Sequence, residues 1–418
     1  MKKSELTWIP WSIRSESITK KELSHISNKT VPFQFCGKKL KLALTMGLFS
    51  SNDVDSGTRL LLKTLAKETD LASFRTIADI GCGVGTIGLA LKANNPEARV
   101  IMRDRDALAC AYTRWNGEMN GIEPDVVEQE LFMTGLEENS LDLLVTNIPA
   151  KAGDEVIEDF FLRAPNYLTE KGLIALVIVS PLREEAERLM EEHEAEILYR
   201  EHTKMHSVYH FRRTDSRGKD EGLTPYIRHR GDFELEGREY EADTVYNVPD
   251  FDLVGWKHQL GAKLLKPHSK SGTWCFWNPG QGHLPLWFSS KCRPGADRII
   301  LSGRDILQCR ITEHNLKQSG FEGELLPLSQ PGISSLQESL EEDSLDLLVV
   351  DQNDSIPRKD WWTPLKETGL SLLKKGGLLV LYGKSSDLHQ FMKGGNRGFT
   401  PLGDDRYKGN RALVLRKN

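Results

Sequence analysis

Two kinds of hydrophobic pattern alternate along the chain. Short continuous apolar runs such as 172–179 predict buried strands, and longer segments with one apolar face predict amphipathic helices. Between residues 76 and 213 the pattern predicts strands near 76–80, 98–103, 124–128, 141–147 and 172–179 and two more within 196–213, with helices near 86–94, 106–119, 154–168 and 181–193. Alternation of this kind is typical of an α/β fold, in which a mostly parallel sheet carries helices on both faces. The final pair of strands has no helix between them, which predicts an antiparallel hairpin at the sheet edge.

The region ahead of this alternation has local signals of its own. Thr19 to Glu22 has the spacing of a capping box, which predicts a short helix from about Lys20 to Ile26. Residues 33–42 alternate around a glycine and predict a hairpin, and residues 55–65 predict an amphipathic helix.

The whole pattern occurs twice. Residues 233–240 parallel 33–40, and the segment 341–349 matches 137–145 in eight of nine positions. Further blocks correspond at nearly the same offset of about 200 residues: 273–282 with 76–85, and 298–305 with 99–106. We therefore predict a tandem duplication. The predicted organisation is an N-terminal extension (1–32), a first domain (33–213), a charged, glycine-containing linker (214–224) and a second domain (225–418).

Composition narrows the class of protein. A chain of 418 residues has room for two or three domains. Its net charge of −5 does not exclude nucleic-acid binding, because a local basic face is enough for that. The six cysteines form no Cys-x-x-Cys pair, so we expect free thiols in a reducing cytoplasm, without disulfides or a metal site. No apolar run reaches membrane-spanning length and the start lacks a signal-peptide core, so we expect a cytoplasmic protein with no membrane contact.

The most informative stretch is a glycine-rich turn between the predicted strand 76–80 and the helix that follows it. It reads Asp79-Ile80-Gly81-Cys82-Gly83-Val84-Gly85. Glycines let the backbone approach a ligand, and the free N–H groups of the new helix face that ligand. The spacing departs from the G-x-G-x-x-G of dinucleotide sites, which disfavours a nicotinamide cofactor. An ordinary strand-to-helix turn is the alternative.

Two acids beside the turn indicate which cofactor it would hold. Asp79 precedes the first glycine and suits an ammonium group of an amino acid, directly or through water. Asp104 ends the next strand and suits the two hydroxyls of a ribose, through charge-assisted hydrogen bonds. Its neighbour Asp106 is better placed to cap the following helix. S-adenosylmethionine carries both an amino-acid ammonium group and a ribose, and we predict it as the cofactor.

Residues from about Phe33 to Arg213 resemble the "methyltransferase small" domain of the ribosomal RNA guanine-N2 methyltransferases. The segments Gly47-Leu48-Phe49-Ser50 and Asp55-Ser56-Gly57-Thr58 are similar to that family's G-V-F-S and D-x-G-T/S, and Asn147-Ile148-Pro149-Ala150 stands where the family has N-P-P-F/Y. The resemblance implies two tandem Rossmann-like, seven-stranded methyltransferase domains. It also implies that Asp55 and Thr58 lie at the amino-acid end of the cofactor and Glu130 near its adenine. A helix cap is the alternative for Asp55, and a solvated side chain for Glu130.

Asn147, Ile148 and Pro149 are the predicted catalytic element. Methyl transfer to an amino group conjugated to a ring needs the nitrogen lone pair turned toward the methyl carbon. The Asn147 side-chain oxygen and the Ile148 carbonyl can each accept an N–H bond from that group, so that catalysis rests on positioning. The alternative is a buried, structural Asn147.

Ala150 departs from the family pattern, which has an aromatic ring at this position. Stacking of such a ring on a base contributes about 1–3 kcal/mol. We therefore predict that Phe49 or Tyr209 supplies the ring, or that the acceptor is not a flat base.

The second copy has lost these residues. Asp79 corresponds to Phe276, Gly81 to Asn278 and Asp104 to Gly303, while Asn147-Ile148-Pro149 corresponds to 351–353 and the Asp55 region to 252–254. We predict a pseudo-enzyme domain with a structural or substrate-binding role. The family also pairs a degenerate copy with an active one, but there the degenerate copy comes first.

A segment of the second domain could bind RNA. Residues 253–296 contain no Asp or Glu, while lysines including Lys257 and Lys263 alternate with tryptophans. Basic residues track phosphates and exposed rings stack on bases. Core tryptophans and a solvated helix face are the alternative.

The sequence therefore predicts an S-adenosylmethionine-dependent methyltransferase acting on an exocyclic base nitrogen of RNA, as in ribosomal RNA guanine-N2 methylation. A methyltransferase of a protein side chain or a small metabolite is the second hypothesis, favoured by Ala150 and the acidic net charge. The third is a non-catalytic cofactor- and RNA-binding factor, which the intact Asp79, Asp104 and Asn147 disfavour.

Overall fold

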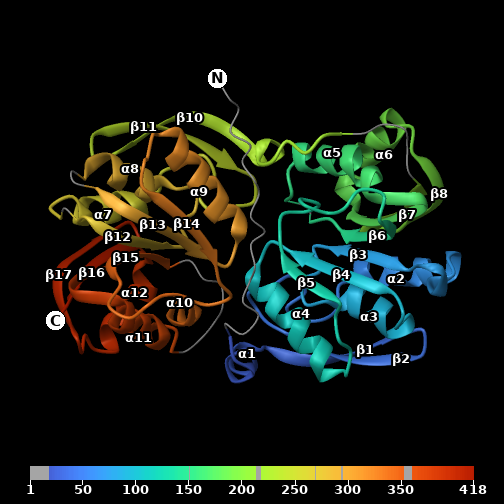
Figure 1. Ribbon diagram of the computed structural model, residues 1–418, viewed down its shortest axis with the longest axis horizontal. Helices are drawn as coiled ribbons and strands as arrows, with labels where there is room; N and C mark the ends of the chain where they lie inside the picture. The colour runs from blue at the N-terminus through green and yellow to red at the C-terminus, as the bar shows by residue number, and fades with distance from the viewer. Residues whose placement is uncertain (1–17, 150, 213–217, 269, 293–294, 353–359) are drawn as a thin grey trace.

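The computed structural model describes residues 18–149, 151–212, 218–268, 270–292, 295–352 and 360–418. Two halves of similar construction lie side by side (Figure 1). The first half contains α1 (Lys20–Ile26), β1 (Lys29–Phe35), β2 (Lys38–Leu44), α2 (Ser56–Glu68), β3 (Thr76–Ile80), α3 (Thr86–Asn94), β4 (Arg99–Asp104), α4 (Ala107–Met119), β5 (Val126–Gln129), β6 (Leu141–Asn147), α5 (Asp154–Arg163), β7 (Leu168–Val179), α6 (Arg183–Glu192), β8 (Glu196–His202) and β9 (His206–Arg212).

The second half repeats this order of strands and long helices. It contains β10 (Ile227–Leu235), β11 (Arg238–Val245), α7 (Trp256–Leu265), β12 (Gly272–Trp277), α8 (His283–Lys291), β13 (Ala296–Gly303), α9 (Ile306–Gln318), β14 (Glu324–Ser329), α10 (Leu336–Ser339), β15 (Leu345–Gln352), α11 (Trp362–Leu372), β16 (Leu373–Lys384), α12 (Ser385–Lys393), β17 (Phe399–Tyr407) and β18 (Asn410–Lys417).

Each half is built on a seven-stranded sheet. The strand order is β5-β4-β3-β6-β7-β9-β8 in the first and β14-β13-β12-β15-β16-β18-β17 in the second. The strands β3 to β7 pair in parallel, and β9 pairs antiparallel with both β7 and β8. This confirms the predicted α/β fold and the hairpin at the sheet edge. The capping box at Thr19 and the helix that it begins are also present.

The first sheet is buried on both faces because its strands are apolar at successive positions. Leu143 and Val145 of β6 pack with α2, α3 and α4 and the β1–β2 hairpin on one face, while Leu144 packs with α5 and α6 on the other. Successive side chains of a strand point to opposite faces, so a continuous apolar run feeds two cores at once.

The duplication is visible in individual hydrogen bonds. The amide of Asn116 in α4 accepts from the backbone N–H of Ala43 and donates to the carbonyls of Ala43 and Val84. Asn315 in α9 makes the same three bonds with residues that correspond to these in the second half, Asp243 and Gln281. Both asparagines are buried and tie the hairpin to the glycine turn of their own half.

A pseudo-twofold interface joins the halves. Arg105, which follows β4, pairs with Asp305 at the start of α9 at 2.9 Å, and its counterpart Arg304 pairs with Asp106 at the start of α4. Asp106 and Asp305 form an antiparallel bridge with each other. Reciprocal contacts of this kind are typical of an isologous interface. Side chains of Val245, Ile306 and other second-half residues complete the core over α5 and α6, so the halves share buried apolar surface.

Each half also sends its leading segment across to the other. Glu22 of α1 accepts a hydrogen bond from Ser334 of the second half at 3.1 Å. The corresponding segment ahead of β10 lies on the first half, where Asp220 pairs with Arg163 at 3.1 Å. The described parts of the predicted extension and linker therefore each contact the opposite half. We call the described residues 218–226 ahead of β10 the arm. The residues 1–17 and 213–217 of these predicted segments lie outside the described part of the chain.

Two further expectations concern the chain as a whole. All six cysteines are free thiols, five of them buried. Within the described residues, the structure has no helix that is both long and apolar enough to span a membrane.

Candidate active site

The glycine turn adopts a backbone that other residues rarely accept. Gly81, Gly83 and Gly85 have φ angles of 77°, 58° and 85°, all in the left-handed region. Gly85 is the N-cap of α3, and a Cβ on it would lie 3.0 Å from Thr113. A Cβ on Gly81 or Gly83 would meet nothing within 4 Å, so backbone conformation and the approach of a ligand are what favour glycine at these two positions.

Asp79 lies directly beneath the turn. It is fully buried, and one carboxylate oxygen accepts the N–H of Gly88 in α3 at 2.8 Å. The other oxygen has no hydrogen-bond partner among the described residues. Burial raises the pKa of Asp79 to about 7. Asp79 therefore does not line the cavity itself but lies behind its wall. One of its oxygens stabilises the turn, and the other is left without a partner among the described residues.

Asp104 ends β4 and faces the cavity. Its carboxylate accepts the N–H of Gly83 and the N–H of Asp106, both at 2.9 Å. Burial raises the pKa of Asp104 to about 6. The neighbouring Asp106 caps α4 through the N–H of Leu108, as the sequence predicts.

The cavity has a volume of about 290 Å³. It extends from the glycine turn, past Asp104, to Asn147 and Pro149 at the end of β6. It therefore meets the carboxyl ends of β3, β4 and β6, which is where open α/β sheets bind ligands.

Asn147 is held in one orientation by residues at the start of α2. Its side-chain N–H₂ donates to the carboxylate of Asp55 and to the hydroxyl of Thr58, both at 3.1 Å. Asp55 also caps α2 by accepting the N–H of Thr58. Asp55 is thus both the helix cap of the alternative hypothesis and the group that orients Asn147. Within the described part of the chain, the side-chain oxygen of Asn147 accepts no hydrogen bond, and the residue lines the cavity.

Glu130 follows β5 and is buried rather than solvated. Arg310 from α9 of the second half pairs with its carboxylate at 2.7 Å, and the N–H of Leu131 donates to the same group. Burial raises the pKa of Glu130, and the guanidinium of Arg310 opposes this effect. Nothing in the sequence signals this pair, since 180 residues separate its members.

The second half contributes further to the cavity wall. Tyr226, at the end of the arm, and Asn247, which follows β11, both line the cavity. No motif in the sequence marks either residue. The duplication could have indicated Asn247, because it corresponds to Gly47 of the Gly47–Ser50 segment. Gly47 also lines this cavity.

The two aromatic residues predicted to stack on the substrate, Phe49 and Tyr209, lie in different places. Phe49 lines the cavity and is 64% exposed, as a stacking residue at a cavity mouth would be. Tyr209 is buried in β9, away from the cavity lining, where its hydroxyl donates to Glu187 at 3.0 Å. The expectation that Tyr209 stacks on a substrate is therefore wrong, because the inward face of its strand belongs to the core. Ala150 lies outside the described residues.

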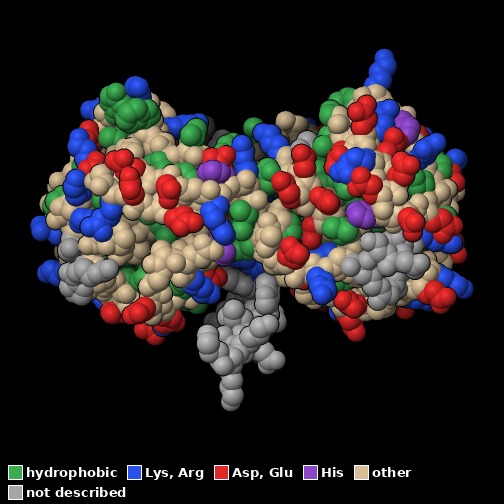
Figure 2. Space-filling model, turned by 90° about the horizontal axis from the view of Figure 1, so that it is seen from above, with side chains coloured by type: hydrophobic (Ala, Val, Ile, Leu, Met, Phe, Trp, Pro, Cys, Tyr) green, Lys and Arg blue, Asp and Glu red, His purple; other side chains and the backbone are tan. Residues whose placement is uncertain are grey.

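In its described residues (253–268, 270–292 and 295–296), the Lys/Trp segment does not form the expected basic face. Lys257 is largely buried between the carboxylates of Asp250 and Asp351, with both distances 2.6 Å. Lys263 is exposed but pairs with Asp405 at 2.6 Å. Three of the four tryptophans of this segment are core residues: Trp274, Trp277 and Trp287. The face of the molecule seen from above mixes acidic and basic side chains (Figure 2).

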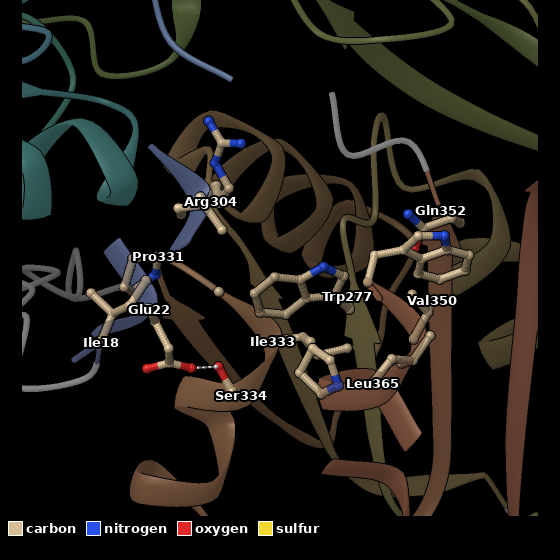
Figure 3. A pocket seen from close by; sticks show the side chains of 14 residues that line it. Ile18, Glu22, Trp277, Arg304, Pro331, Ile333, Ser334, Val350, Gln352 and Leu365 are labelled. Atoms are coloured by element: carbon tan, nitrogen blue, oxygen red, sulfur yellow. Dashed lines mark hydrogen bonds between the residues drawn. The ribbon is translucent and has the colours of Figure 1, made fainter. Parts of the chain in front are cut away.

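The place of the cofactor site in the second half is largely filled. The glycine-turn backbone persists there, with φ of 55° at Asn278 and 91° at Gly282, but Asn278 lies so close to Gly303 that a Cβ on the glycine would be 2.8 Å from its amide. The described residues around Trp277 line a cavity of about 80 Å³ there. Figure 3 shows the buried Trp277 among its lining, with Glu22 of α1 bonded to Ser334 at one side.

The amino-acid end of this relict site is also occupied. The helix caps show that Asp55 corresponds to Gly255, the N-cap of α7, and not to Asp252 as the sequence alignment predicts. Lys257 then corresponds to Gly57, and its ammonium lies beside Asp351, the counterpart of Asn147. Asp250, His258 and Asp351 lie close enough together to hold a metal cation. The positively charged ammonium group of Lys257 contacts both carboxylates instead.

Comparisons with known proteins agree with this geometry. The family model "Methyltransferase small domain" matches residues 39–210. An uncharacterized protein of Bacillus subtilis (strain 168), YbxB, is 30% identical over 154 residues, which are 36% of this chain and 75% of that protein. The Ribosomal RNA small subunit methyltransferase C of Actinobacillus pleuropneumoniae serotype 5b is 32% identical over 168 residues, and the match spans 37% of this chain and half of the relative.

A solved structure matches both halves. The 16S rRNA N2 G1207 methyltransferase of T. thermophilus, solved with AdoMet and guanosine, superposes with a TM-score of 0.63 over 97% of this chain and 100% of its own, at 15% identity. At this identity the likeness establishes the fold. The paired seven-stranded domains are thus shared, and the sequence similarity to the family lies in the first half, around the cavity described above. The chain belongs to the methyltransferase small domain family.

Proposed function

We propose that this protein is an S-adenosylmethionine-dependent methyltransferase that modifies an exocyclic amino nitrogen of an RNA base, with ribosomal RNA as the substrate class. The observation that carries the proposal is the fixed amide of Asn147 at the end of the cavity. Asp55 and Thr58 accept both of its N–H interactions, which turns its oxygen toward the ligand.

The residues of the first half fit the cofactor. The turn at Gly81 and Gly83 leaves open space where side chains would otherwise stand. Asp104 at the wall suits the ribose hydroxyls, and the unpaired buried oxygen of Asp79 provides negative potential behind the amino-acid end. When bound, S-adenosylmethionine supplies an electrophilic methyl group. The second half offers about 80 Å³ and neither acid, so we assign it no cofactor of its own.

The chain's own residues supply position. The oxygen of Asn147 and the carbonyl of Ile148 accept the two N–H groups of the acceptor amine, which directs the nitrogen lone pair along the line of displacement. Held in this way, the nitrogen would be placed to accept the methyl group that the cofactor supplies, with the electron pair of the broken S–C bond kept by sulfur and one amine proton released to solvent. Pro149 lines the cavity next to this element.

RNA as the acceptor is supported by the curated relative that acts on ribosomal RNA and by Phe49, an exposed ring at the cavity. Ribosomal RNA as substrate would place the protein in the cytoplasm, where free thiols are expected. A protein side chain or a metabolite is the alternative acceptor. The mixed charge of the surface in Figure 2 and the ion-paired Lys257 and Lys263 favour it.

The test is transfer of labelled methyl from S-adenosylmethionine to a fractionated cell extract, with RNA, protein and small molecules counted separately. We expect label in RNA for the wild type and none for Asn147→Ala. Asn410→Ala, in the distant β17–β18 hairpin, is the matched control and should behave as wild type. Label confined to protein or metabolites would overturn RNA as the acceptor.

A further inference from the structure

We propose that the degenerate second domain completes the cofactor pocket of the first, at the end that would receive the adenosine. This inference rests on the proposed function. Two elements of the second domain line the pocket: the arm that ends at Tyr226 and the loop that carries Asn247. A third, Arg310 of α9, pairs with the lining residue Glu130.

Arg310 fixes the side chain of Glu130, a residue that lines the pocket. Glu130 lines the cavity between Asp104 and Phe132, and its carboxylate receives Arg310 at 2.7 and 2.8 Å and the N–H of Leu131. Both side chains are buried. A buried carboxylate without a partner is strongly disfavoured, so the ion pair with Arg310 holds the Glu130 side chain in place at the wall. Arg310 is a positioning residue, because it acts through Glu130.

Asn247 is positioned by contacts across the interface. It has a φ of 56°, a left-handed conformation that asparagine tolerates better than most residues. Its carbonyl accepts the side chain of Arg105 at 2.6 Å, and Arg105 is itself paired with Asp305. The loop is also joined to the arm, because the N–H of Tyr246 donates to the carbonyl of Tyr226 at 3.0 Å. Asn247 and Tyr226 therefore form one fixed wall.

The interface is asymmetric at the point where the cavities differ. Tyr226 and Phe132 line the large cavity. Their counterparts in the duplication, Ile26 and Gly332, line the small cavity of the second half. The counterpart of Glu130 is Gln330, which donates to Ser339 of its own half. The buried ion pair of Glu130 thus occurs beside the cavity that can hold a cofactor, and the relict side has a neutral group.

The second domain therefore determines affinity for the adenosine part of the ligand, while the residues that orient the acceptor lie in the first. Removal of its contacts should raise the Kd and KM for the cofactor and leave kcat nearly unchanged, since Asn147 and its holders are untouched.

The experiment measures binding of S-adenosylhomocysteine to the full chain by calorimetry, together with the melting temperature. The test variants are Arg310→Met and Asn247→Gly. The glycine accepts the positive φ, so this variant removes a side chain without straining the loop. The control is Arg411→Met, which removes a buried arginine that pairs with the exposed carboxylate of Asp404 in the β17–β18 hairpin of the same domain.

We expect Arg310→Met to raise the Kd about tenfold or more and Asn247→Gly to raise it at least about threefold. Arg411→Met should lower the melting temperature while its Kd stays within about twofold of wild type. In a Glu130→Gln background, Arg310→Met should add less than about threefold, because the two residues act as one unit.

The outcomes separate this inference from the proposed function. A wild-type chain that does not bind S-adenosylhomocysteine overturns the proposed function. A wild type that binds, with Asn247→Gly and Arg310→Met equal to it, overturns the role of the second domain alone. If Arg310→Met fails to fold, Asn247→Gly decides, and an unchanged Kd in that variant counts against the inference.

Discussion

Replacement of Asp79 by Asn should make the protein more stable at neutral pH and at the same time weaken cofactor binding. Asp79 is fully buried beneath the glycine turn with one oxygen unpaired, and burial raises its pKa to about 7 from an ordinary value of 3.8. A folded-state pKa above the unfolded value means that folding favours the protonated form. The associated stability is fully present below about pH 3.8, and it is lost as the pH rises toward 7.

The size of this effect follows from the pKa difference of about 3, which corresponds to about 4 kcal/mol of penalty for the ionised group at pH 8. Asparagine at this position keeps an oxygen for the N–H of Gly88 but buries an amide without a partner, at a cost of about 1–3 kcal/mol. We expect a net gain of about 1–3 kcal/mol for Asp79→Asn at pH 8. The gain should shrink or reverse at pH 5, where the wild-type carboxyl is mostly protonated.

The assay is thermal and urea unfolding of wild type and Asp79→Asn from pH 5 to pH 8, in parallel with the Kd for S-adenosylmethionine. The cofactor's positive charges favour the ionised acid behind the wall, so wild-type affinity should increase as the pH rises through 7. In Asp79→Asn that pH dependence should be lost and the Kd raised by about tenfold or more. A variant that is equally destabilised at pH 5 and pH 8, with unchanged affinity, would refute the reasoning.

Three further predictions concern other parts of the molecule. Asn147→Ala should abolish methyl transfer while the Kd for S-adenosylmethionine changes by less than about fivefold, because the side-chain oxygen faces the acceptor; a large loss of binding would contradict that role. Phe49→Ala should raise the KM for RNA about 5- to 150-fold, from a stacking energy of about 1–3 kcal/mol, whereas Leu402→Ala, which truncates an exposed side chain of the other domain, should have no effect. Asn315→Ala should reduce the free energy of unfolding by roughly 2–4 kcal/mol, because three buried bonds are lost; a loss below 1 kcal/mol in urea unfolding would contradict this.

The sequence predicted the fold because the signals for it are local. Continuous apolar runs such as that of β7 specify strands that are buried on two faces, and a repeated block such as 341–349 reveals the duplication. The glycine turn was equally readable, since a positive φ at Gly81 and Gly83 leaves few other residues acceptable. These features depend on short stretches of chain.

Features that depend on distant partners were missed or misplaced. Lys257 looks basic and accessible in the sequence, but Asp250 and Asp351 enclose it, one of them 94 residues away. Tyr209 was expected at the substrate, yet the strand period points it into the core. Arg310 carries no motif, and its pairing with Glu130 exists because the two halves dock.

The measurement that tests the central claim most directly is nucleoside analysis of RNA methylated in vitro. Ribosomal RNA would be incubated with labelled S-adenosylmethionine and wild-type or Asn147→Ala protein, digested to nucleosides and separated. The account predicts label in a base-methylated nucleoside, on an exocyclic nitrogen, with wild type and not with Asn147→Ala. Label on the ribose, label that persists in Asn147→Ala, or transfer to protein alone would contradict it.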